Sequence, residues 1–448
     1  MRENASNKRG MVMKKVVKFG GSSLADAKQV AKACQLIKAD KTRQYVIPSA
    51  PGKRFEQDQK VTDMLINCYQ LASSKQDFLG QLAQVKGRFQ AIIKGLKLDL
   101  SLEEDFSQIK QHLNQKPQFD YVASRGEYLN GKILAAYLKF DFIDPYEYIF
   151  FNEDGYLNSY KTQKSMARRL SQSQFAVIPG FYGQAKDGQV KTFSRGGSDI
   201  TGSIVAAACE ADIYENWTDV SGFLVADPKI VAHPVPIKTI TYRELRELSY
   251  MGASVLHEAA IFPVRSKGIP INIKNTNKPD DDGTWIVEST ARKTDYIITG
   301  IAGKKGFCSL TVTKDLMNSE IGFCRRALQA FEDCNLSIEH MPSGIDTMTV
   351  VVHEDEFLDK EQAVVTRLHR LTNPDSIEIE ADLALIAVVG RGMKDQLGTA
   401  ARLFSALAKE HINIKMIDQG SSELNIIIAV AERDFENAIR AIYQTFVK

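Results

Sequence analysis

Two short glycine-rich segments of this sequence have the composition of anion-binding turns. In the first, residues 18–23 (KFGGSS), an apolar run ends at two glycines and an amphipathic run follows. Adjacent glycines let the backbone approach a phosphate closely, and the amino end of a helix offers free N–H groups. Lys18 can place its ammonium against a γ-phosphate, and Gly20, Gly21 and Ser22 are candidate nucleotide contacts. The spacing matches no standard phosphate-loop motif, so a purely structural strand-to-helix turn is the alternative.

The second segment, residues 194–201 (SRGGSDIT), precedes an alanine-rich helical run. Arg195 can hold a carboxylate through two parallel hydrogen bonds. Gly196 and its neighbour expose backbone N–H groups, and Asp199 can orient nearby lysines. A helix N-cap at Ser198 or Asp199 would explain those two residues but would leave Arg-Gly-Gly unexplained. We therefore interpret the segment as functional.

A third segment, residues 217–229 (WTDVSGFLVADPK), is expected to form a strand, a turn and a second strand. Thr218 and Asp219 can meet ribose or base groups, and Lys229 can reach phosphate. A plain hairpin that turns at Asp-Pro is the alternative.

The elements that must position these residues alternate between short β-rich runs and helical stretches, which predicts a layered α/β fold. The region from 61 to about 113 is expected to be mainly helical, after a helix from about 24 to 39. The expected strands are 14–19, 44–48, 121–124, 140–143, 175–179, 212–217 and 285–287.

After about residue 295 the pattern changes to two copies of a split βαβ unit of roughly 70 residues each. In the first copy we expect strands at 296–303, 307–313, 336–341 and 347–353, with helices at 322–334 and 361–371. The second copy repeats this order with strands at 383–389, 412–417 and 425–430 and helices at 398–411 and 435–446. This is the order of ferredoxin-like modules and also of the small ligand-binding ACT domain.

Composition narrows the class of protein. Lys plus Arg number 57 against 55 for Asp plus Glu, so no basic field for nucleic acid is expected. The longest apolar runs are far too short to cross a membrane. Residues 1–12 have no apolar signal core and are expected to be a disordered tail. The six cysteines form no C-x-x-C pair, which predicts reduced thiols, a cytoplasmic location and no metal site.

Together the three segments resemble, in order and spacing, the aspartate kinase branch of the amino acid kinase family. Residues 124–130 (SRGEYLN), 252–257 (GASVLH) and 420–425 (GSSELN) are also similar to family motifs. The resemblance extends over about residues 13–446. It implies an amino acid kinase fold, a layered α/β/α sandwich, over 13–295 and ACT repeats over 296–375 and 376–448. It also implies that strand 297–303 pairs with the second repeat.

The resemblance further implies a reaction and a role for each site residue. ATP would phosphorylate the β-carboxylate of L-aspartate, with Mg²⁺ carried by the nucleotide, as the first step toward lysine, threonine and methionine. Lys18 would stabilise the transferring phosphoryl group and Asp199 would organise the centre. The implied aspartate contacts are Ser49, Thr62, Glu127 for the ammonium, Arg195 for a carboxylate, and Gly196. The implied nucleotide contacts are Lys18, Gly20, Gly21, Ser22, Thr218, Asp219, Lys229 and Ser254.

Two departures from the family pattern bear on the phosphate site. Ser254 stands where a nucleotide-contacting Lys is common, which leaves open the cation that completes the phosphate clamp; Lys229 and Lys274 are candidates. The loop over residues 48–62 is longer than usual. It carries Lys53 and Arg54, which could be lid residues of the pocket or part of a solvated loop.

For regulation, the resemblance implies an amino acid bound at the first repeat, with L-lysine as the expected effector. The loop from Met317 through Ser319 and Gly322 to Phe323 would hold its backbone groups, facing a strand of Ser337, Ile338 and Glu339. The Glu339 carboxylate would pair with a side-chain ammonium, which threonine lacks. An exposed strand glutamate without such a role is the alternative.

Other functions stay open at this point. A sibling kinase acting on glutamate, acetylglutamate or a nucleotide is one, and a catalytically inactive amino-acid sensor is another. No second catalytic domain or dinucleotide motif follows residue 446, so we expect a monofunctional enzyme. ACT sheets expose strand edges, which predicts a homodimer, or a dimer of dimers, through these repeats.

Overall fold

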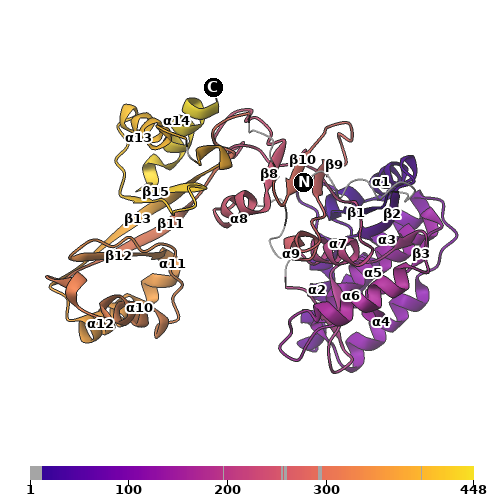
Figure 1. Ribbon diagram of the computed structural model, residues 1–448. Coiled ribbons are helices and arrows are strands. Elements are labelled where there is room, and N and C mark those ends of the chain that lie inside the picture. Colours follow the sequence, from indigo (N-terminus) through magenta and orange to yellow (C-terminus); the bar gives the residue numbers. More distant parts are fainter. Residues whose placement is uncertain are drawn as a thin grey trace. The chain divides into compact units, whose positions relative to one another are not determined.

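The computed structural model describes residues 13–194, 196–253, 256, 260–290, 295–394 and 396–447. The chain divides into two compact units, each with its own sheet (Figure 1). The first comprises Met1–Phe223, Lys238–Tyr242 and Val255–Thr290, and the second Leu224–Ile237, Arg243–Ser254 and Ala291–Lys448. No helix among the described residues is both long and apolar enough to cross a membrane.

The sheet of the first unit has eight strands in the order β3-β4-β2-β1-β7-β9-β10-β8. All neighbouring pairs are parallel except β9 with β10. Parallel sheets are buried on both faces, which accounts for the nearly uniform burial of β1 and β2. The strands are β1 (Lys15–Phe19), β2 (Arg43–Pro48), β3 (Asp141–Phe142), β4 (Ala176–Val177), β7 (Ile213–Thr218), β8 (Thr239–Thr241), β9 (Ile271–Asn275) and β10 (Thr284–Val287). A separate hairpin joins β5 (Tyr182–Gln184) to β6 (Val190–Thr192).

Helices pack against this sheet and against one another (Figure 1). Asp26 caps the first α-helix, because its side chain accepts a hydrogen bond from Gln29 N at 2.9 Å. The helices are α1 (Ala27–Ala39), α2 (Val61–Ser73), α3 (Leu79–Gly95), α4 (Glu103–Gln115), α5 (Phe119–Leu138), α6 (Ser159–Leu170), α7 (Gly197–Ala208) and α9 (Ile261–Arg265), with a 3-10 turn at Gly21–Leu24. The expected helical region 61–113 is confirmed as α2, α3 and α4.

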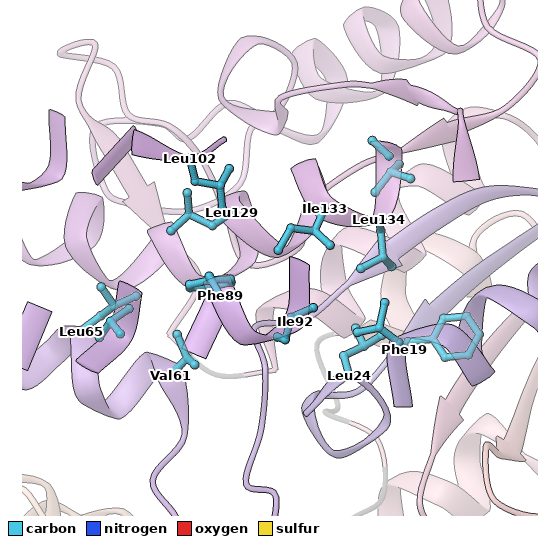
Figure 2. Close-up of a cluster of buried hydrophobic side chains, with 14 of the residues drawn as sticks. Phe19, Leu24, Val61, Leu65, Phe89, Ile92, Leu102, Leu129, Ile133 and Leu134 are labelled. Atoms are coloured by element: carbon cyan, nitrogen blue, oxygen red, sulfur yellow. The ribbon is translucent and has the colours of Figure 1, made fainter. Parts of the chain in front are cut away.

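The buried cluster of the first unit joins sheet and helices through apolar side chains of several elements. Figure 2 shows Phe19 and Leu24, from the end of β1 and the turn after it, together with Ile92 and Leu134 from two helices. The end of β1 is therefore held by the core on which the helices also depend.

The strand expected at 121–124 is wrong, because these residues lie inside α5. A short apolar run does not by itself distinguish a strand from a buried helix. Here Val122, Leu129 and Ile133 continue the buried side at helical spacing. The helix ends only at Lys139, whose φ of 59° is left-handed.

The second unit is built on an antiparallel sheet in the order β12-β11-β13-β15-β14. Its strands are β11 (Gly300–Thr313), β12 (Thr347–His353), β13 (Ser376–Val389), β14 (Met416–Asp418) and β15 (Asn425–Ala431). The helices α10 (Phe323–Glu332) and α12 (Glu361–Thr372) lie together near one end of the sheet, and α13 (Thr399–Lys409) and α14 (Phe435–Val447) near the other (Figure 1). The short α11 spans Glu354–Phe357.

Two strand predictions for this unit are wrong in detail. The strands expected at 296–303 and 307–313 are one strand, β11, whose register shifts around Gly306 at a φ of 84°. Its first part, Gly300 to Lys305, pairs with Ala384–Val389 of β13. Residues 336–341 form no strand within the described chain; only isolated bridges such as His340 with Val351 occur there. Pro342, which has no N–H group, limits this pairing.

One helix, α8 (Tyr242–Tyr250), is bound to the second unit through a buried carboxylate. Glu244 Oε1 accepts hydrogen bonds from Thr299 Oγ1 at 2.5 Å and from Arg391 N at 2.9 Å. Its other oxygen accepts from the Arg391 guanidinium at 2.7 Å. A buried carboxylate is stable only when its oxygens are paired in this way.

The core of the first unit gives a test of packing at α3. Replacing Ile92, which is 2% exposed, with Ala should lower the free energy of unfolding by roughly 2 to 5 kcal/mol, because a cavity is left behind. The same change at the partly buried Ile93 should cost clearly less. Both tryptophans, Trp217 and Trp285, belong to this unit, so fluorescence during urea unfolding measures it. Equal losses at the two positions would contradict this packing.

Candidate functional site

The carboxyl ends of three adjacent parallel strands meet around one cavity of about 580 Å³. Phe19 at the end of β1 is in register with Pro48 of β2 and with Trp217 of β7, so the segments after these strands converge. Ligands of open α/β sheets bind at such a place. The cavity lining includes most of the residues expected to bind nucleotide or aspartate: Gly20, Gly21, Ser22, Ser49, Thr62, Glu127, Thr218 and Asp219.

The glycine turn after β1 is pressed against the loop after β2. Gly52 N donates a hydrogen bond to Gly21 O at 2.8 Å. A Cβ atom on Gly21 would lie 2.9 Å from Ala50 O, and one on Gly52 would lie 2.6 Å from the Gly21 carbonyl carbon. Any side chain at either position would collide with backbone, so both glycines are required for this approach.

The Lys18 ammonium is held by the buried carboxylate of Asp199. Its Nζ lies 2.6 Å from Asp199 Oδ1, and both residues are about 9% exposed. Asn216 on β7 donates to the same Asp199 oxygen at 2.9 Å, and its own oxygen lies 3.4 Å from Lys18 Nζ. A Cβ on Gly20 would be 3.8 Å from Nζ, so the ammonium lies close to the turn. No sequence pattern indicates a role for Asn216, since only the register of β1 with β7 places it beside Lys18.

Glu127, on α5, is a buried carboxylate without a full set of partners. Its Oε2 atom is buried and has no hydrogen-bond partner within the described chain. Burial raises the pKa of Glu127 to about 7, against a smaller opposite effect of a backbone hydrogen bond from Ala50. Such a group, at the wall of a cavity, can accept a cationic group of a ligand. Asn130, one turn further along α5, donates to Ser49 O at 2.7 Å and so fixes the neighbouring loop.

Basic residues of the long loop after β2 also line the cavity. Lys53, Arg54 and Lys60 are all part of its wall. The sequence left open whether Lys53 and Arg54 belong to a lid or to a solvated loop. The structure favours a place at the pocket for both residues, because they line the cavity. Lys60, which no sequence pattern singled out, also lines it.

Two residues expected to be near the phosphate, Lys229 and Lys274, are not part of the described lining of this cavity. Lys229 belongs to the second unit, where its backbone N–H bonds to Asp227 Oδ1 at 2.8 Å. The second strand expected before it is wrong, because residues 219–238, all described, contain only an isolated bridge, from Leu224 to Pro236. The Lys274 ammonium lies 5.5 Å from the Trp217 ring centroid.

The second anion-binding segment is only partly described. Arg195 and Ser254 lie outside the described residues. Gly196 is the left-handed N-cap of α7, with a φ of 60°. Ser194 lines a different cavity, of about 1080 Å³, in the same unit.

The expected effector residues surround the start of α10. Met317 and Phe323 are buried, Gly322 is the left-handed N-cap of the helix, and Ser319 Oγ donates to Asn318 Oδ1 at 3.3 Å. Ser337 and Ile338 precede Glu339 on the neighbouring segment, and Ile338 packs on the core of this half.

Glu339 is the acidic residue of this group, and it is not an exposed strand glutamate. Only 7% of its side chain is exposed, and Oε1 lies 3.5 Å from His353 Nε2. Burial and a side-chain hydrogen bond with Glu339 raise the pKa of Tyr250, on α8, to about 12. The Glu339 carboxylate therefore contacts α8, the helix that carries Glu244.

Comparisons with known proteins all point to the same protein family. Residues 13–275 match the sequence model of the amino acid kinase family, and residues 386–446 match an ACT domain. The chain is 41% identical to aspartokinase 3 of Bacillus subtilis, over 96% of this chain and 98% of that protein. The crystal structure of an aspartate kinase from Clostridium acetobutylicum aligns with a TM-score of 0.89 and 48% identity, over 97% of this chain and all of that one.

A more distant structure shows the same fold. E. coli aspartokinase III in complex with aspartate and ADP aligns with a TM-score of 0.75 at 22% identity, over 96% of this chain and 99% of that one. The same enzyme in complex with lysine and aspartate aligns with a TM-score of 0.73.

The raised pKa of Glu127 predicts a pH-dependent stability. Burial raises its pKa from the ordinary 4.5 to about 7, so the unliganded protein loses stability as pH rises through this range. The loss amounts to roughly 3 kcal/mol at pH 8 relative to pH 4.5. In Glu127→Gln, which cannot ionise, this component should be absent. Urea unfolding followed by tryptophan fluorescence at both pH values measures it.

The matched control is Glu378→Gln, which changes an exposed carboxylate of the second unit. It should leave the pH dependence of the parent unchanged. If Glu127→Gln and the parent showed the same pH dependence, the carboxylate would not titrate near neutral pH.

Proposed function

The chain belongs to the amino acid kinase family and, within it, to the aspartokinases, and from this premise we propose that it transfers the γ-phosphoryl group of ATP to the β-carboxylate of L-aspartate. The product is 4-phospho-L-aspartate, which leads to lysine, threonine and methionine. The observation that carries this proposal is the single cavity at the ends of β1, β2 and β7. It combines a phosphate-binding turn with the unpartnered carboxylate of Glu127.

Aspartate is held by groups of opposite charge at its two ends. Glu127 receives the substrate ammonium, which would satisfy the buried Oε2 atom and lower the pKa of the carboxyl group. Ser49 and Thr62 line the same wall. Arg195 and the backbone of Gly196 bind a substrate carboxylate. The reacting β-carboxylate is already ionised at pH 7, so no protein base is needed, and catalysis consists of positioning and charge neutralisation.

Lys18 is the catalytic cation of this mechanism. Charge spreads over the transferring phosphoryl group in the transition state, and a fixed ammonium stabilises it without reorganisation. Asp199 and Asn216 keep the Lys18 ammonium in one place, through contacts of 2.6 Å and 3.4 Å. The side chain is thus oriented before the substrates bind.

The nucleotide binds along the turn of Gly20, Gly21 and Ser22, with Thr218 and Asp219 across the cavity. Ser254 and Lys229 complete the contacts implied by the family. The acidic residues that line the cavity are Glu56, Glu127 and Asp219, and no group of three metal-ligating side chains occurs in the described parts of the chain. This set suits Mg²⁺ that arrives on the phosphate oxygens, and Asp219 is the lining carboxylate that belongs to the expected nucleotide contacts. Bound there, the ion neutralises developing phosphate charge.

The C-terminal region is a regulatory module with residues 296–375 and 376–448 as its two repeats. L-Lysine is the effector that we propose, bound by the loop from Met317 to Phe323 and by Ser337, Ile338 and Glu339. The outer edges of the sheet, β12 and β14, support pairing with a second copy, so we also propose a homodimer. The six cysteines are all unpaired, which supports the cytoplasm as its location.

One assay tests the activity and its substrate. ADP release is measured with ATP and Mg²⁺ in the presence of L-aspartate, L-glutamate or N-acetyl-L-glutamate. Turnover should occur with aspartate and be far slower with the two others. Turnover with glutamate alone would identify a sibling kinase. No turnover with any of the three substrates would indicate a catalytically inactive amino-acid sensor.

Removing the Lys18 cation tests its role in the transition state. Lys18→Met should lower kcat about a hundredfold or more, while ATP affinity changes much less, because the cation acts mainly on charge that develops during transfer. Steady-state kinetics and nucleotide binding measure the two quantities. Lys28→Met, an exposed change on α1, is the matched control. Near-normal turnover in Lys18→Met would refute the assignment.

The effector assignment is tested by titrating activity with lysine, threonine and methionine. Lysine should inhibit, and Glu339→Gln should need about tenfold more lysine or more, because a charge-assisted hydrogen bond to the side-chain ammonium is lost. The exposed Glu332→Gln on α10 should keep the sensitivity of the parent. Inhibition by threonine alone, or full lysine sensitivity in Glu339→Gln, would rule out lysine binding through this carboxylate and leave the kinase assignment intact.

A further inference from the structure

The cation that completes the phosphate site can be sought among the residues that line the cavity. Lys18 is already paired with Asp199, and Lys274 is not part of the lining. The described basic residues of the lining are Lys53, Arg54 and Lys60, all on the loop after β2. A triphosphate brings several negative charges, so a cation without a carboxylate partner is the group to find.

The Arg54 guanidinium forms an ion pair with an acidic residue of its own loop, Asp58. Its Nε atom lies 2.7 Å from Asp58 Oδ2, and its second nitrogen lies 2.9 Å from Oδ1. The hydrogen bond from Arg54 holds the pKa of Asp58 well below its usual range, so this carboxylate is ionised and holds the Arg54 guanidinium. Arg54 therefore shapes the loop through Asp58.

Lys53 has no such partner. Its Nζ donates only to the backbone oxygen of Glu56, at 3.1 Å, and no carboxylate of the described residues lies within ion-pair distance. The residue before it, Gly52, bonds to Gly21 of the phosphate-binding turn. Lys53 is thus attached one residue from that turn. Lys60, by contrast, stands at the other end of the loop, as the N-cap of α2.

The loop is fixed by a buried arginine on α3. Arg88 is 7% exposed, and its guanidinium donates to Gly52 O at 2.9 Å and to Gln59 O at 3.2 Å, at the two ends of the loop. It also binds Ala25 O at 3.2 Å, just after the turn, and Asp58 Oδ2 at 3.0 Å. One planar cation with several donors can hold all these acceptors, whereas an ammonium cannot.

On the premise of the proposed function, we propose that Lys53 binds the phosphate chain of ATP in this cavity, and that Arg88 is a positioning residue that keeps Lys53 beside the Gly20–Ser22 turn. The contact between Lys53 and Glu56 O is weak and exposed, so the ammonium can leave it for an anion. The loop over residues 48–62, for which the sequence left open a pocket lid or a solvated loop, then forms a wall of the nucleotide site.

The probe is the Mg²⁺ complex of AMP-PNP, an ATP analogue with a non-hydrolysable terminal linkage, titrated by calorimetry into the full-length protein. Lys53→Met should weaken its binding about tenfold or more, because a charge-assisted hydrogen bond to phosphate is lost. Lys53→Arg, which keeps the charge, should stay within about threefold of the parent. The exposed Lys110→Met on α4 should also stay close to the parent. The KM for aspartate should be unchanged in Lys53→Met.

The positioning role of Arg88 is tested by a double-mutant cycle with Lys53. Arg88→Lys should weaken AMP-PNP binding about fivefold in the parent background but add nothing to Lys53→Met, since the two changes act through one contact. Asp58→Asn is the second variant of the same anchor, and thermal unfolding of each variant checks its fold. If Arg88→Lys and Asp58→Asn weakened AMP-PNP binding as much in Lys53→Met as in the parent, Arg88 would not act through Lys53.

The outcomes separate this inference from the proposed function. If the parent binds AMP-PNP but does not phosphorylate aspartate, the proposed function fails, and the Lys53 variants still decide the phosphate contact by binding. If the parent turns over aspartate and Lys53→Met binds AMP-PNP normally, Lys53 has no phosphate contact. A rise in the aspartate KM without loss of nucleotide binding overturns the assignment as well, and a parent that binds no nucleotide overturns both.

Discussion

The parallel pairing of β1 with β2 on one side and with β7 on the other is the constraint on which the site depends. It brings the segments after Phe19, Pro48 and Thr218 to the same edge of the sheet. Two of these segments then approach so closely that Gly21 and Gly52 bond through their backbones. No side-chain interaction could replace this arrangement, because the contact depends on the absence of side chains. The nucleotide turn and the basic loop are therefore one structure.

Around that edge, charged groups are buried in two different ways. Lys18 and Asp199 neutralise each other, and Asn216 satisfies a further acceptor position. This pair is ready before a ligand arrives, which is what electrostatic preorganisation requires. Glu127 is the opposite case, because its buried oxygen lacks a partner and its pKa is raised to about 7. Its burial without a full set of partners is costly, and an ammonium would relieve this cost more than a neutral donor. On the proposed function, the Glu127 arrangement would contribute selectivity and the Lys18–Asp199 pair would contribute rate.

Local sequence predicted much of this site, since the glycine turns, their flanking strands and the segment with Asp219 are recognisable from neighbouring residues, and Glu127 was implied by the family resemblance. Three kinds of feature escaped it. Asn216 and Arg88 act through contacts with residues 17 or more positions away, which no local pattern reports. The run at 121–124 was too short to separate strand from helix until the whole of α5 was considered. Lys229 was expected to contact the nucleotide from the family motif that it shares with Asp219, but the two residues belong to different compact units, which no local pattern reports.

For the second unit, the decisive feature is that both repeats contact α8. Glu244 is bound by Thr299 and Arg391, and Glu247 Oε2 accepts a hydrogen bond from Asn425 of the second repeat at 2.6 Å. Tyr250, at the end of the same helix, bonds to Glu339 of the first repeat. An effector can change activity only if it interacts differently with two arrangements of the protein. On the proposed regulation, a ligand ammonium that binds the Glu339 carboxylate would compete with the Tyr250 hydroxyl, so its binding free energy would depend on the position of α8. The chain continues from Tyr250 directly into residues 252–257, the segment that resembles a motif of the family. The proposed effector contact at Glu339 is therefore connected, through a single helix, to the segment that the resemblance assigns to the nucleotide.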